Sequence, residues 1–315
     1  MRKKSFLFLC LLLFFGSAEN AAAQPKTDSQ KAIAVAKIPF EISADGHIFL
    51  RARVNDSAPL LFGLDSGFEQ TAIATKQAKA LNLKTYGDSQ VTGGGEQTED
   101  FSFTKDVSFD LPGVNFKLKE IGVLALNFPA LAGGESIAGI LGYDFISRFV
   151  VEIDYAGKVI NLYHPQSYRY RGRGEILPIK IIDNYPSVRA TVRLPGLAPV
   201  SGMFVIDTGA GNDIFFHSPF VRRYKLLNSK QETAEAATLG IGGTSKIRIG
   251  RANEIRLGRT VIANPGVHFS LATKGDSATA LSAGHIGNGV FRQFKLVIFD
   301  QTRRRLILEP NNKIG

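Results

Sequence analysis

The sequence has a single cysteine, Cys10, and that residue lies inside an apolar run near the N-terminus. If residues 1–23 are removed as a secretory signal, the remaining chain has no cysteine, which excludes a disulfide and any thiolate-bound metal. The stability of that chain must then come from core burial. The roughly 290 residues that remain are enough for one large domain or two smaller ones.

Signatures of several other enzyme classes are also missing. The five histidines form no His-Glu-x-x-His pair, and the stretch nearest to a Gly-x-Ser-x-Gly nucleophile turn, residues 134–138, ends in alanine. The glycine-rich stretches 240–243 and 287–289 lack the spacing of a dinucleotide-binding loop. We therefore expect no metal and no cofactor, and we interpret each histidine as structural.

One segment has the composition of a targeting signal. The bases at positions 2–4 precede the apolar run 6–15, and the alanines at 21–23 offer a small-residue cleavage site. We expect residues 1–23 to be a signal peptide that exports the protein to the periplasm or the medium; an uncleaved anchor is the alternative. Residues 24–37 should form a flexible arm. No other segment approaches the about 20 apolar residues of a membrane span, so we expect no transmembrane span in the mature chain.

The formal net charge is +10, and such an excess can attract anionic partners. The bases are nevertheless spread along predicted strands. Tyrosine and arginine are interleaved within residues 166–175, but no nucleic-acid-binding module surrounds them. We interpret this tract as a solvated linker between two lobes, and we expect no nucleic-acid partner.

An apolar run that ends in an aspartate, a hydroxyl residue and a glycine occurs twice, with the two aspartates 142 residues apart. Other landmarks recur in the same order. Alternating apolar and polar residues over 48–54 return over 188–194, with Ala52 and Ala190 aligned at an offset of 138. A possible short helix follows each aspartate, with Thr75 and Ser218 as the expected caps. A glycine-rich hairpin signal comes next, and each half closes with an apolar block and a glycine. This order predicts an internal duplication of a predominantly β unit, with lobes at residues 38–165 and 176–312.

The two aspartates, Asp65 and Asp207, would meet if the two units face each other about a pseudo-twofold axis. Two carboxyl groups roughly 3 Å apart cannot both ionise, so they share a proton and titrate as a pair. Such a pair offers a base for a bound water and an acid for a carbonyl oxygen, as amide hydrolysis without a covalent intermediate requires. The rest of each motif would support the pair by bonding across the interface and by allowing close approach; these residues are Ser66, Gly67, Thr208 and Gly209.

These residues resemble the motifs of the retropepsin-like aspartic protease family, in its bacterial form with both lobes on one chain. The matching landmarks are the two aspartate motifs and the blocks Ile140–Gly142 and His285–Gly287, and the resemblance covers about residues 38–310. It implies an all-β fold of two similar β-barrel lobes with short helices, an aspartate from each lobe, a water nucleophile and no metal. A monomer is expected, because both lobes lie on one chain.

The glycine-rich hairpins are candidates for flaps that close over a peptide or protein substrate in the cleft between the lobes. With the residues after each motif glycine, the expected flap and substrate-binding set is Gly93, Gly94, Gly95, Gly240, Ile241, Gly242, Gly243, Phe68 and Ala210. Family members have a small residue after the motif glycine, as Ala210 is in the second half. The first half departs from this pattern with Phe68. His285 also replaces the usual first apolar residue of its block.

Two functions of different class remain open. The first is an exported aspartic endopeptidase that uses Asp65 and Asp207. The second is a catalytically impaired relative that keeps the cleft as a peptide-binding module, and the bulky Phe68 favours it. A pair of turn aspartates that only cap nearby backbone amides is the structural alternative for the two motifs.

Overall fold

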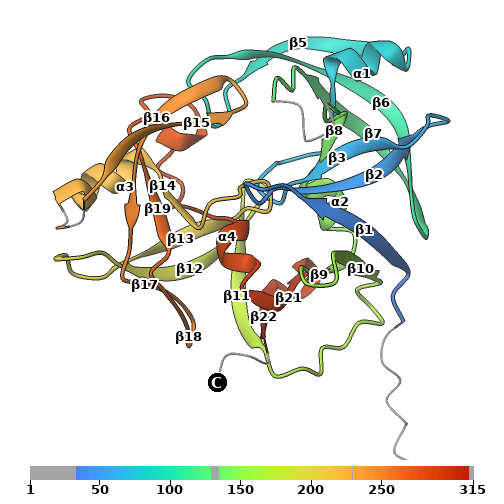
Figure 1. Ribbon diagram of the computed structural model, residues 1–315. Helices are drawn as coiled ribbons and strands as arrows, with labels where there is room; N and C mark the ends of the chain where they lie inside the picture. The colour runs from blue at the N-terminus through green and yellow to red at the C-terminus, as the bar shows by residue number, and fades with distance from the viewer. Residues whose placement is uncertain (1–32, 129–134, 229, 231, 312–315) are drawn as a thin grey trace, which may run out of the picture. The chain divides into compact units, whose positions relative to one another are not determined.

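The structure is a computed structural model that describes residues 33–128, 135–228, 230 and 232–311. The expected signal peptide and most of the expected arm therefore lie outside the described residues. The described residues belong to one compact unit that consists mainly of strands, with short helices between them (Figure 1). The prediction of an all-β fold is confirmed. None of the described helices is both long and apolar enough to span a bilayer.

We call the elements up to β10 the first half. They are β1 (Ala36–Ile42), β2 (Ile48–Val54), β3 (Leu60–Leu64), β4 (Ala72–Ala74), α1 (Thr75–Ala80), β5 (Thr85–Val91), β6 (Glu99–Leu111), β7 (Val114–Leu124), β8 (Gly139–Leu141), α2 (Tyr143–Ile146), β9 (Val150–Asp154) and β10 (Val159–Tyr163).

The elements from β11 onward form the second half. They are β11 (Glu175–Ile182), β12 (Tyr185–Arg193), β13 (Val200–Ile206), β14 (Ile214–Phe216), α3 (Ser218–Arg223), η1 (Leu226–Asn228), β15 (Ala234–Gly240), β16 (Gly243–Arg251), β17 (Glu254–Leu257), β18 (Thr260–Ala263), β19 (Gly266–Ser270), η2 (Asp276–Ala278), β20 (Gly284–Ile286), α4 (Asn288–Phe291), β21 (Phe294–Asp300), η3 (Gln301–Arg303) and β22 (Arg305–Pro310).

The strand that precedes each aspartate has the same neighbours in both halves. In the first half β3 pairs antiparallel with β2 and parallel with β8. In the second half β13 pairs antiparallel with β12 and parallel with β20. Next to these, β4 lies between β8 and β7, and β14 lies between β20 and β19. The strand pairings around β3 and β13 therefore match. The internal duplication of the two halves stays a prediction.

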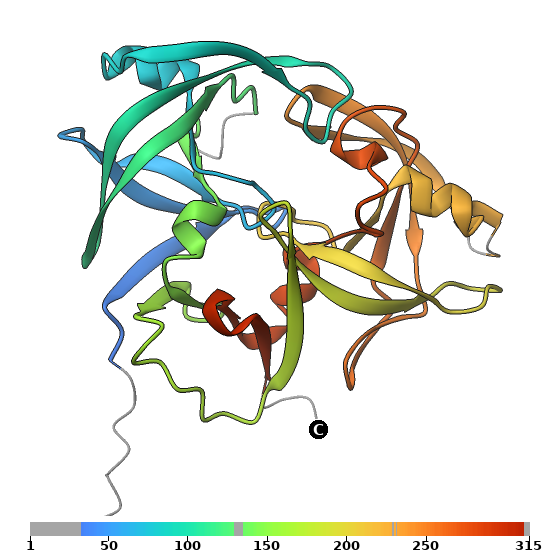
Figure 2. The ribbon, with the colours of Figure 1, turned by 180° about the vertical axis from the view of Figure 1, so that it is seen from behind.

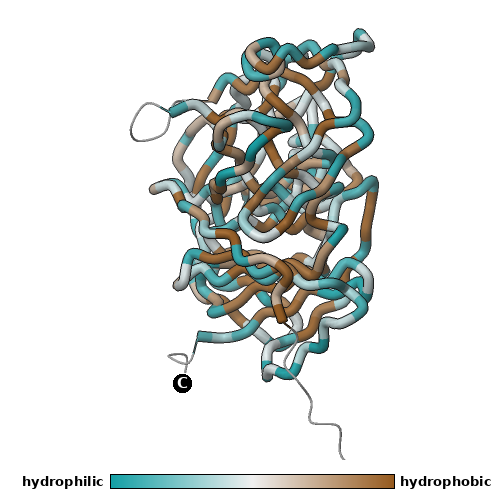
Figure 3. The backbone as a smooth tube through the Cα atoms, turned by 90° about the vertical axis from the view of Figure 1, so that its right-hand side faces the viewer, coloured by the Kyte–Doolittle hydropathy of each residue, from teal (hydrophilic) through white to brown (hydrophobic). Residues whose placement is uncertain are grey.

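Alternation along the strands follows the expected pattern. In β2 the side chains of Leu50, Ala52 and Val54 are buried, whereas Arg51 and Arg53 are exposed. A strand with one face on the core and the other in solvent has this period of two. Hydrophobic and hydrophilic segments accordingly alternate along the backbone (Figure 3).

One antiparallel sheet contains strands of both halves. Its six strands lie in the order β1, β10, β9, β21, β22, β11, and the two halves meet where β9 pairs with β21. In Figures 1 and 2 this shared sheet lies below the turns that follow β3 and β13. The expected lobe boundaries at 38–165 and 176–312 stay a prediction, and β1 begins at Ala36, before the first of them.

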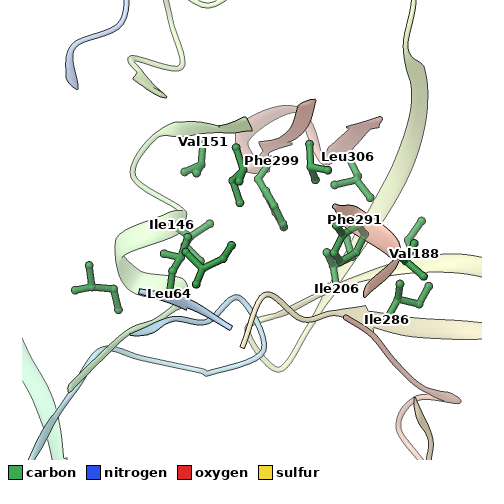
Figure 4. Close-up of a cluster of buried hydrophobic side chains, with 14 of the residues drawn as sticks. Leu64, Ile146, Val151, Val188, Ile206, Ile286, Phe291, Phe299 and Leu306 are labelled. Atoms are coloured by element: carbon green, nitrogen blue, oxygen red, sulfur yellow. The ribbon is translucent and has the colours of Figure 1, made fainter. Parts of the chain in front are cut away.

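Apolar side chains fill the space between the two aspartate turns and the shared sheet. Leu64 and Ile206, the residues before the two aspartates, are buried in this cluster. Leu64 lies beside Ile146 of α2, and Ile206 beside Phe291 of α4 (Figure 4). Phe299 of β21 is buried in the same cluster. The core that supports both turns is therefore built symmetrically from one helix of each half.

Two local expectations differ from the structure. Helices α1 and α3 form where short helices were expected, but their N-cap residues are Ala74 and His217, and neither makes a side-chain cap hydrogen bond. The Ser218 hydroxyl, expected to cap α3, donates instead to the Ala272 carbonyl at 2.6 Å. The Ser218 hydroxyl thus bonds to a residue distant in sequence instead of to a backbone amide at the start of its own helix.

The tract 166–175 is packed against the shared sheet and is not a fully solvated linker. Tyr168 is buried and its ring lies 4.9 Å from that of Tyr163 of β10. The Tyr170 hydroxyl donates to Glu309 of β22. The tyrosines of the tract 166–175 thus attach it to the shared sheet by packing and hydrogen bonding. The base-rich turn before β22 is also internally paired, because Arg303 and Arg305 both bind the buried Asp300.

Candidate active site

Each candidate catalytic aspartate follows a buried strand that is held by a parallel neighbour. The Asp65 amide donates to the Leu141 carbonyl of β8 at 3.0 Å, and the Asp207 amide donates to the Ile286 carbonyl of β20 at 2.9 Å. The apolar blocks that recur in the sequence are therefore the strands that fix the two aspartates. Phe204, in β13, is fully buried, which explains why the run before each aspartate is apolar.

The hydroxyl residues of the two motifs join the turns to each other. The Ser66 amide donates to the Thr208 hydroxyl at 2.9 Å, and the Thr208 amide donates to the Ser66 hydroxyl at 3.0 Å. The two hydroxyls in turn donate across the same boundary, Ser66 to the Ile206 carbonyl at 2.6 Å and Thr208 to the Leu64 carbonyl at 3.0 Å. Both side chains are buried, so this network is shielded from competing water.

The motif glycines are required by the carboxyl group of the opposite half. A Cβ on Gly67 would lie 2.7 Å from the Asp207 carboxyl carbon, and a Cβ on Gly209 would lie 2.2 Å from that of Asp65. Each glycine also donates its amide to the aspartate of its own motif, Gly67 to Asp65 at 2.7 Å and Gly209 to Asp207 at 2.9 Å. Each carboxyl group thus lies against the glycine of the other motif.

The two carboxyl groups are close enough to interact electrostatically across the boundary between the halves. Burial raises the pKa of Asp65 well above its usual range, and the nearby Asp207 carboxylate raises it further. Burial also raises the pKa of Asp207, to about 6. Their titrations are therefore linked. Among the described residues, no three His, Cys, Asp or Glu side chains are grouped so as to hold a metal ion.

His285 is the second half's counterpart of Ile140 and lies beside Asp207. Its Nδ1 atom is 3.9 Å from an Asp207 carboxylate oxygen, and its ring stacks on Phe215 at 4.6 Å. Burial lowers the pKa of His285 to about 3, so this ring is neutral when the carboxyl pair titrates. It contributes shape and a dipole there, without a net charge.

Phe68 and Ala210 occupy equivalent places beyond the motif glycines. The Phe68 carbonyl accepts the Tyr143 amide at 2.9 Å, and the Ala210 carbonyl accepts the Asn288 amide at 2.8 Å. Both side chains are half-buried. The larger ring in the first half therefore makes the surroundings of the two aspartates unequal.

The two glycine-rich segments form the tips of facing hairpins. We call residues 92–98, between β5 and β6, the first hairpin tip, and Gly240–Gly243, between β15 and β16, the second hairpin tip. The Gly95 amide donates to the Ile241 carbonyl at 2.9 Å, and the Gln97 amide donates to the Gly242 carbonyl at 2.9 Å. Both tips lie above the turns after β3 and β13 in the view of Figure 1.

Glycine is needed where the two tips touch. A Cβ on Gly95 would lie 2.2 Å from the Gly242 carbonyl group, and a Cβ on Gly93 would lie 2.8 Å from Cβ of Ile241. At Gly94 the nearest atom would be 3.7 Å away, an ordinary contact. The structure thus brings both expected glycine sets together, and only some of their positions demand glycine.

A loop of the second half, between β19 and β20, also holds the first hairpin tip. The Asp276 amide donates to the Gly93 carbonyl at 2.9 Å, and the Ser277 hydroxyl donates to the Gly94 carbonyl at 3.2 Å. The Thr273 amide donates to the Glu96 carboxylate at 2.8 Å. The first hairpin tip is therefore bound by the second half on two sides.

Three residues near the aspartates were missed from the sequence. Tyr185 begins β12, and His47 directly precedes β2 at the equivalent position. Burial raises the pKa of Tyr185 and nearby carboxylates, including Asp65 and Asp207, raise it further, while His47 lowers the pKa of Asp65. The spacing of 138 that relates the two strands could have identified them as a pair. Asn288, fully buried at the start of α4, follows the repeated glycine, but nothing in the sequence distinguishes it from a turn asparagine.

The comparisons with known proteins agree with this geometry in the first half. Residues 50–145 match the family model described as aspartyl protease, a span that includes Asp65 and Ile140–Gly142 but not Asp207. No curated protein matches the chain. The match over residues 50–145, under a third of the chain, and the strand-rich fold support a retropepsin-like aspartic protease family.

Proposed function

We propose that the protein is an exported aspartic endopeptidase in which Asp65 and Asp207 activate a water molecule for attack on a peptide bond. The observation that carries the proposal is that each carboxyl group lies against the glycine of the opposite motif, at the ends of two equivalently paired strands. A pair of aspartates that only capped their own turns would not need to approach each other across the interface. Export rests on the composition of residues 1–23.

The chemistry follows from a pair that holds one proton. The ionised carboxylate accepts a proton from water as the water oxygen attacks the carbonyl carbon, and the protonated carboxyl donates its proton to the carbonyl oxygen. The carboxyl group that took the proton from water then donates it to the nitrogen, the C–N bond breaks, and a hydroxyl of the resulting gem-diol gives its proton to the other carboxylate as the product carboxyl group forms. The pair is returned to its singly protonated form, and no covalent intermediate on the enzyme is required.

The hairpin tips supply a means to bind the chain that is cleaved. An extended peptide beneath them would form strand-like hydrogen bonds with main-chain groups of the hairpins. The bonds between the tips, from Gly95 to Ile241 and from Gln97 to Gly242, would hold both hairpins over the peptide. The substrate would thus be shielded from bulk water during the reaction.

The test is cleavage of a peptide library by the purified protein, with products identified by mass spectrometry. Asp65→Asn and Asp207→Asn should each abolish cleavage while the protein stays folded by circular dichroism. Asp106→Asn is the matched control, since Asp106 is exposed and pairs with Lys117. Undiminished cleavage by either dyad variant would refute the proposal. Peptide binding without cleavage by the unaltered protein would favour the impaired binding module instead.

A further inference from the structure

Asn288 connects three parts of the chain around the second aspartate turn. Its side chain is fully buried. The amide nitrogen donates to the Thr208 carbonyl at 2.6 Å and to the Gly46 carbonyl at 2.9 Å, and the amide oxygen accepts the Tyr155 hydroxyl at 2.7 Å. Two carbonyl oxygens can only accept, so the group that faces them must be the NH₂ of the amide. This fixes the orientation of the side chain.

The contact with Thr208 reaches the Asp207 carboxylate through one peptide group. The Thr208 carbonyl and the Gly209 amide belong to the same planar unit. Asn288 donates to its oxygen, while its N–H donates to the Asp207 carboxylate at 2.9 Å. A donor on the carbonyl fixes the plane of the peptide and polarises its N–H, and hydrogen bonds in such a chain strengthen each other. The stronger hydrogen bond from the Gly209 amide stabilises the ionised form of Asp207.

Among the described residues, the first half shows no equivalent arrangement. Tyr143 stands where Asn288 does, since both follow the block glycine and both donate their backbone amides to equivalent carbonyls, those of Phe68 and Ala210. A tyrosine carries no amide group. Each aspartate accepts the amide of its own motif glycine, Asp65 from Gly67 at 2.7 Å and Asp207 from Gly209 at 2.9 Å. The Asn288 contact with the Thr208 carbonyl is therefore what distinguishes the two motifs, and it favours negative charge on Asp207 over negative charge on Asp65.

We propose that Asn288 is a positioning residue that makes Asp207 the ionised member of the pair and leaves the proton on Asp65. Only the catalytic roles of the two aspartates rest on the proposed function. In that function Asp207 would take the proton from water, and Asp65 would protonate the carbonyl oxygen. The difference between the two carboxyl groups is a property of the folded protein and holds whether or not a peptide is cleaved.

The other titratable groups around the pair leave Asp207 as the carboxyl group that ionises more readily. His285 is neutral, because burial lowers its pKa to about 3. His47 favours the ionised form of Asp65, but it is itself paired with Asp45 at 3.1 Å on a partly exposed hairpin. Tyr185 is uncharged at neutral pH, because burial and the surrounding carboxylates raise its pKa. The pKa of Asp65 is raised well above its usual range, while that of Asp207 is raised to about 6.

The first test isolates each carboxyl group and needs no activity. Asp65→Asn leaves Asp207 as the single carboxyl of the pair, and Asp207→Asn leaves Asp65. The carbon-13 carboxyl resonances of aspartate-labelled protein are followed against pH, and the signal of interest is assigned by difference from the double variant. We expect Asp207 to titrate at a lower pH than Asp65. An Asp65 midpoint at or below that of Asp207 would overturn the proposal.

The second test removes the Asn288 amide. In the background that retains only Asp207, Asn288→Ser should raise the midpoint by about 0.5 to 1 pH unit, as expected for one weakened hydrogen bond to a carboxylate. In the background that retains only Asp65, the same substitution should change the midpoint by less than about 0.2 unit. Equal shifts, or no shift, in the two backgrounds would refute the role of Asn288. If Asn288→Ser does not fold, the first test still decides which carboxyl holds the proton.

Tyr155→Phe is the matched control. It removes the hydroxyl that donates to the oxygen of Asn288 but leaves both donor contacts of the amide nitrogen. It should destabilise the protein without shifting the Asp207 midpoint. A shift as large as that of Asn288→Ser would assign the effect to loss of packing and would overturn the proposal. Failure of the peptide library to be cleaved would refute the proposed function and leave these titrations unaffected.

Discussion

Ser66 and Thr208 each accept the backbone amide of the other through their hydroxyl oxygens, at 3.0 and 2.9 Å. The hydroxyl protons are also used, on carbonyls of the opposite half. The two aspartate turns are therefore held together by a closed set of bonds in which each hydroxyl both donates and accepts. The positions of the two carboxyl groups depend on this connection, because each aspartate directly precedes one of these residues.

Removal of one hydroxyl should weaken the whole interface. Thr208→Val keeps the shape of the side chain but leaves the Ser66 amide and the Leu64 carbonyl without this partner, at a cost of about 2 to 4 kcal/mol in the free energy of unfolding. Thr208→Ser keeps both bonds and should cost less than about 1.5 kcal/mol. Urea denaturation of the two variants beside the unaltered protein measures the difference. Equal stabilities of the valine and serine variants would show that the bonds contribute little.

The aspartate pair should reduce stability at neutral pH. Burial raises the pKa of both carboxyl groups above the unfolded value. Between about pH 4 and 6 the folded state therefore holds protons that the unfolded state has lost, and the free energy of unfolding falls as pH rises through this window. Asp207→Asn removes the penalty and should stabilise the protein by about 1 to 3 kcal/mol at pH 7.5.

The same comparison at low pH provides the control. At pH 3.5, below the pKa of about 3.9 of an unfolded aspartate, both carboxyl groups are mostly protonated in the folded and unfolded states, so most of the advantage of Asp207→Asn should be lost. Asp106→Asn should show no such pH-dependent gain, because Asp106 is exposed. Denaturation curves at pH 3.5 and 7.5 are sufficient. A dyad variant that is less stable than the unaltered protein at pH 7.5 would contradict the burial argument.

The contact between the hairpin tips predicts different effects for neighbouring glycines. Gly95→Ala would place a Cβ 2.2 Å from the Gly242 carbonyl group, whereas the nearest atom to a Cβ at Gly94 is 3.7 Å away. Gly95→Ala should therefore separate the tips, and Gly94→Ala should leave them joined. Hydrogen exchange at the Gln97 amide, which donates to the Gly242 carbonyl, should accelerate at least about tenfold in the first variant only. Equal exchange in both would show that the tips are already apart in solution.

Local pattern was sufficient for much of the fold. The alternation of Leu50, Ala52 and Val54 with two arginines predicted β2 correctly, because a half-buried strand needs only its own period to be recognised. The second strand at an offset of 138 was found in the same way. Helices α1 and α3 were located, but their caps were wrong, since tertiary partners such as the Ala272 carbonyl for Ser218 are invisible in sequence.

The residues that join the two halves were harder to predict. Asn288 binds groups 242, 133 and 80 residues away, and a buried asparagine carries no local pattern that names its partners. The hydrogen bonds between the hairpin tips and the pairing of β9 with β21 likewise depend on how the halves meet. The role of Asp65 and Asp207 as the catalytic pair stays a prediction, which cleavage and titration experiments address separately.

The pH dependence of cleavage should reveal the environment of the pair. The proposed mechanism requires one ionised and one protonated carboxyl group, so kcat/KM should rise as Asp207 ionises and fall as Asp65 loses its proton. Burial raises the pKa of Asp207 to about 6 and that of Asp65 well above its usual range. The acid limb should therefore lie near pH 6, well above the value of an isolated aspartate. His285 should leave this limb unaffected, because its pKa is lowered to about 3.

A fluorogenic peptide chosen from the cleaved library, assayed from pH 3 to 9 at substrate concentrations far below KM, reports this limb directly. Circular dichroism at each pH excludes unfolding as the cause of a loss of activity. An acid limb near the pKa of about 3.9 of an unperturbed aspartate would mean that water or bound peptide solvates the pair in the working enzyme. The desolvation that dominates the free protein would then not govern its chemistry, and Asp207 would ionise as freely as a surface carboxylate.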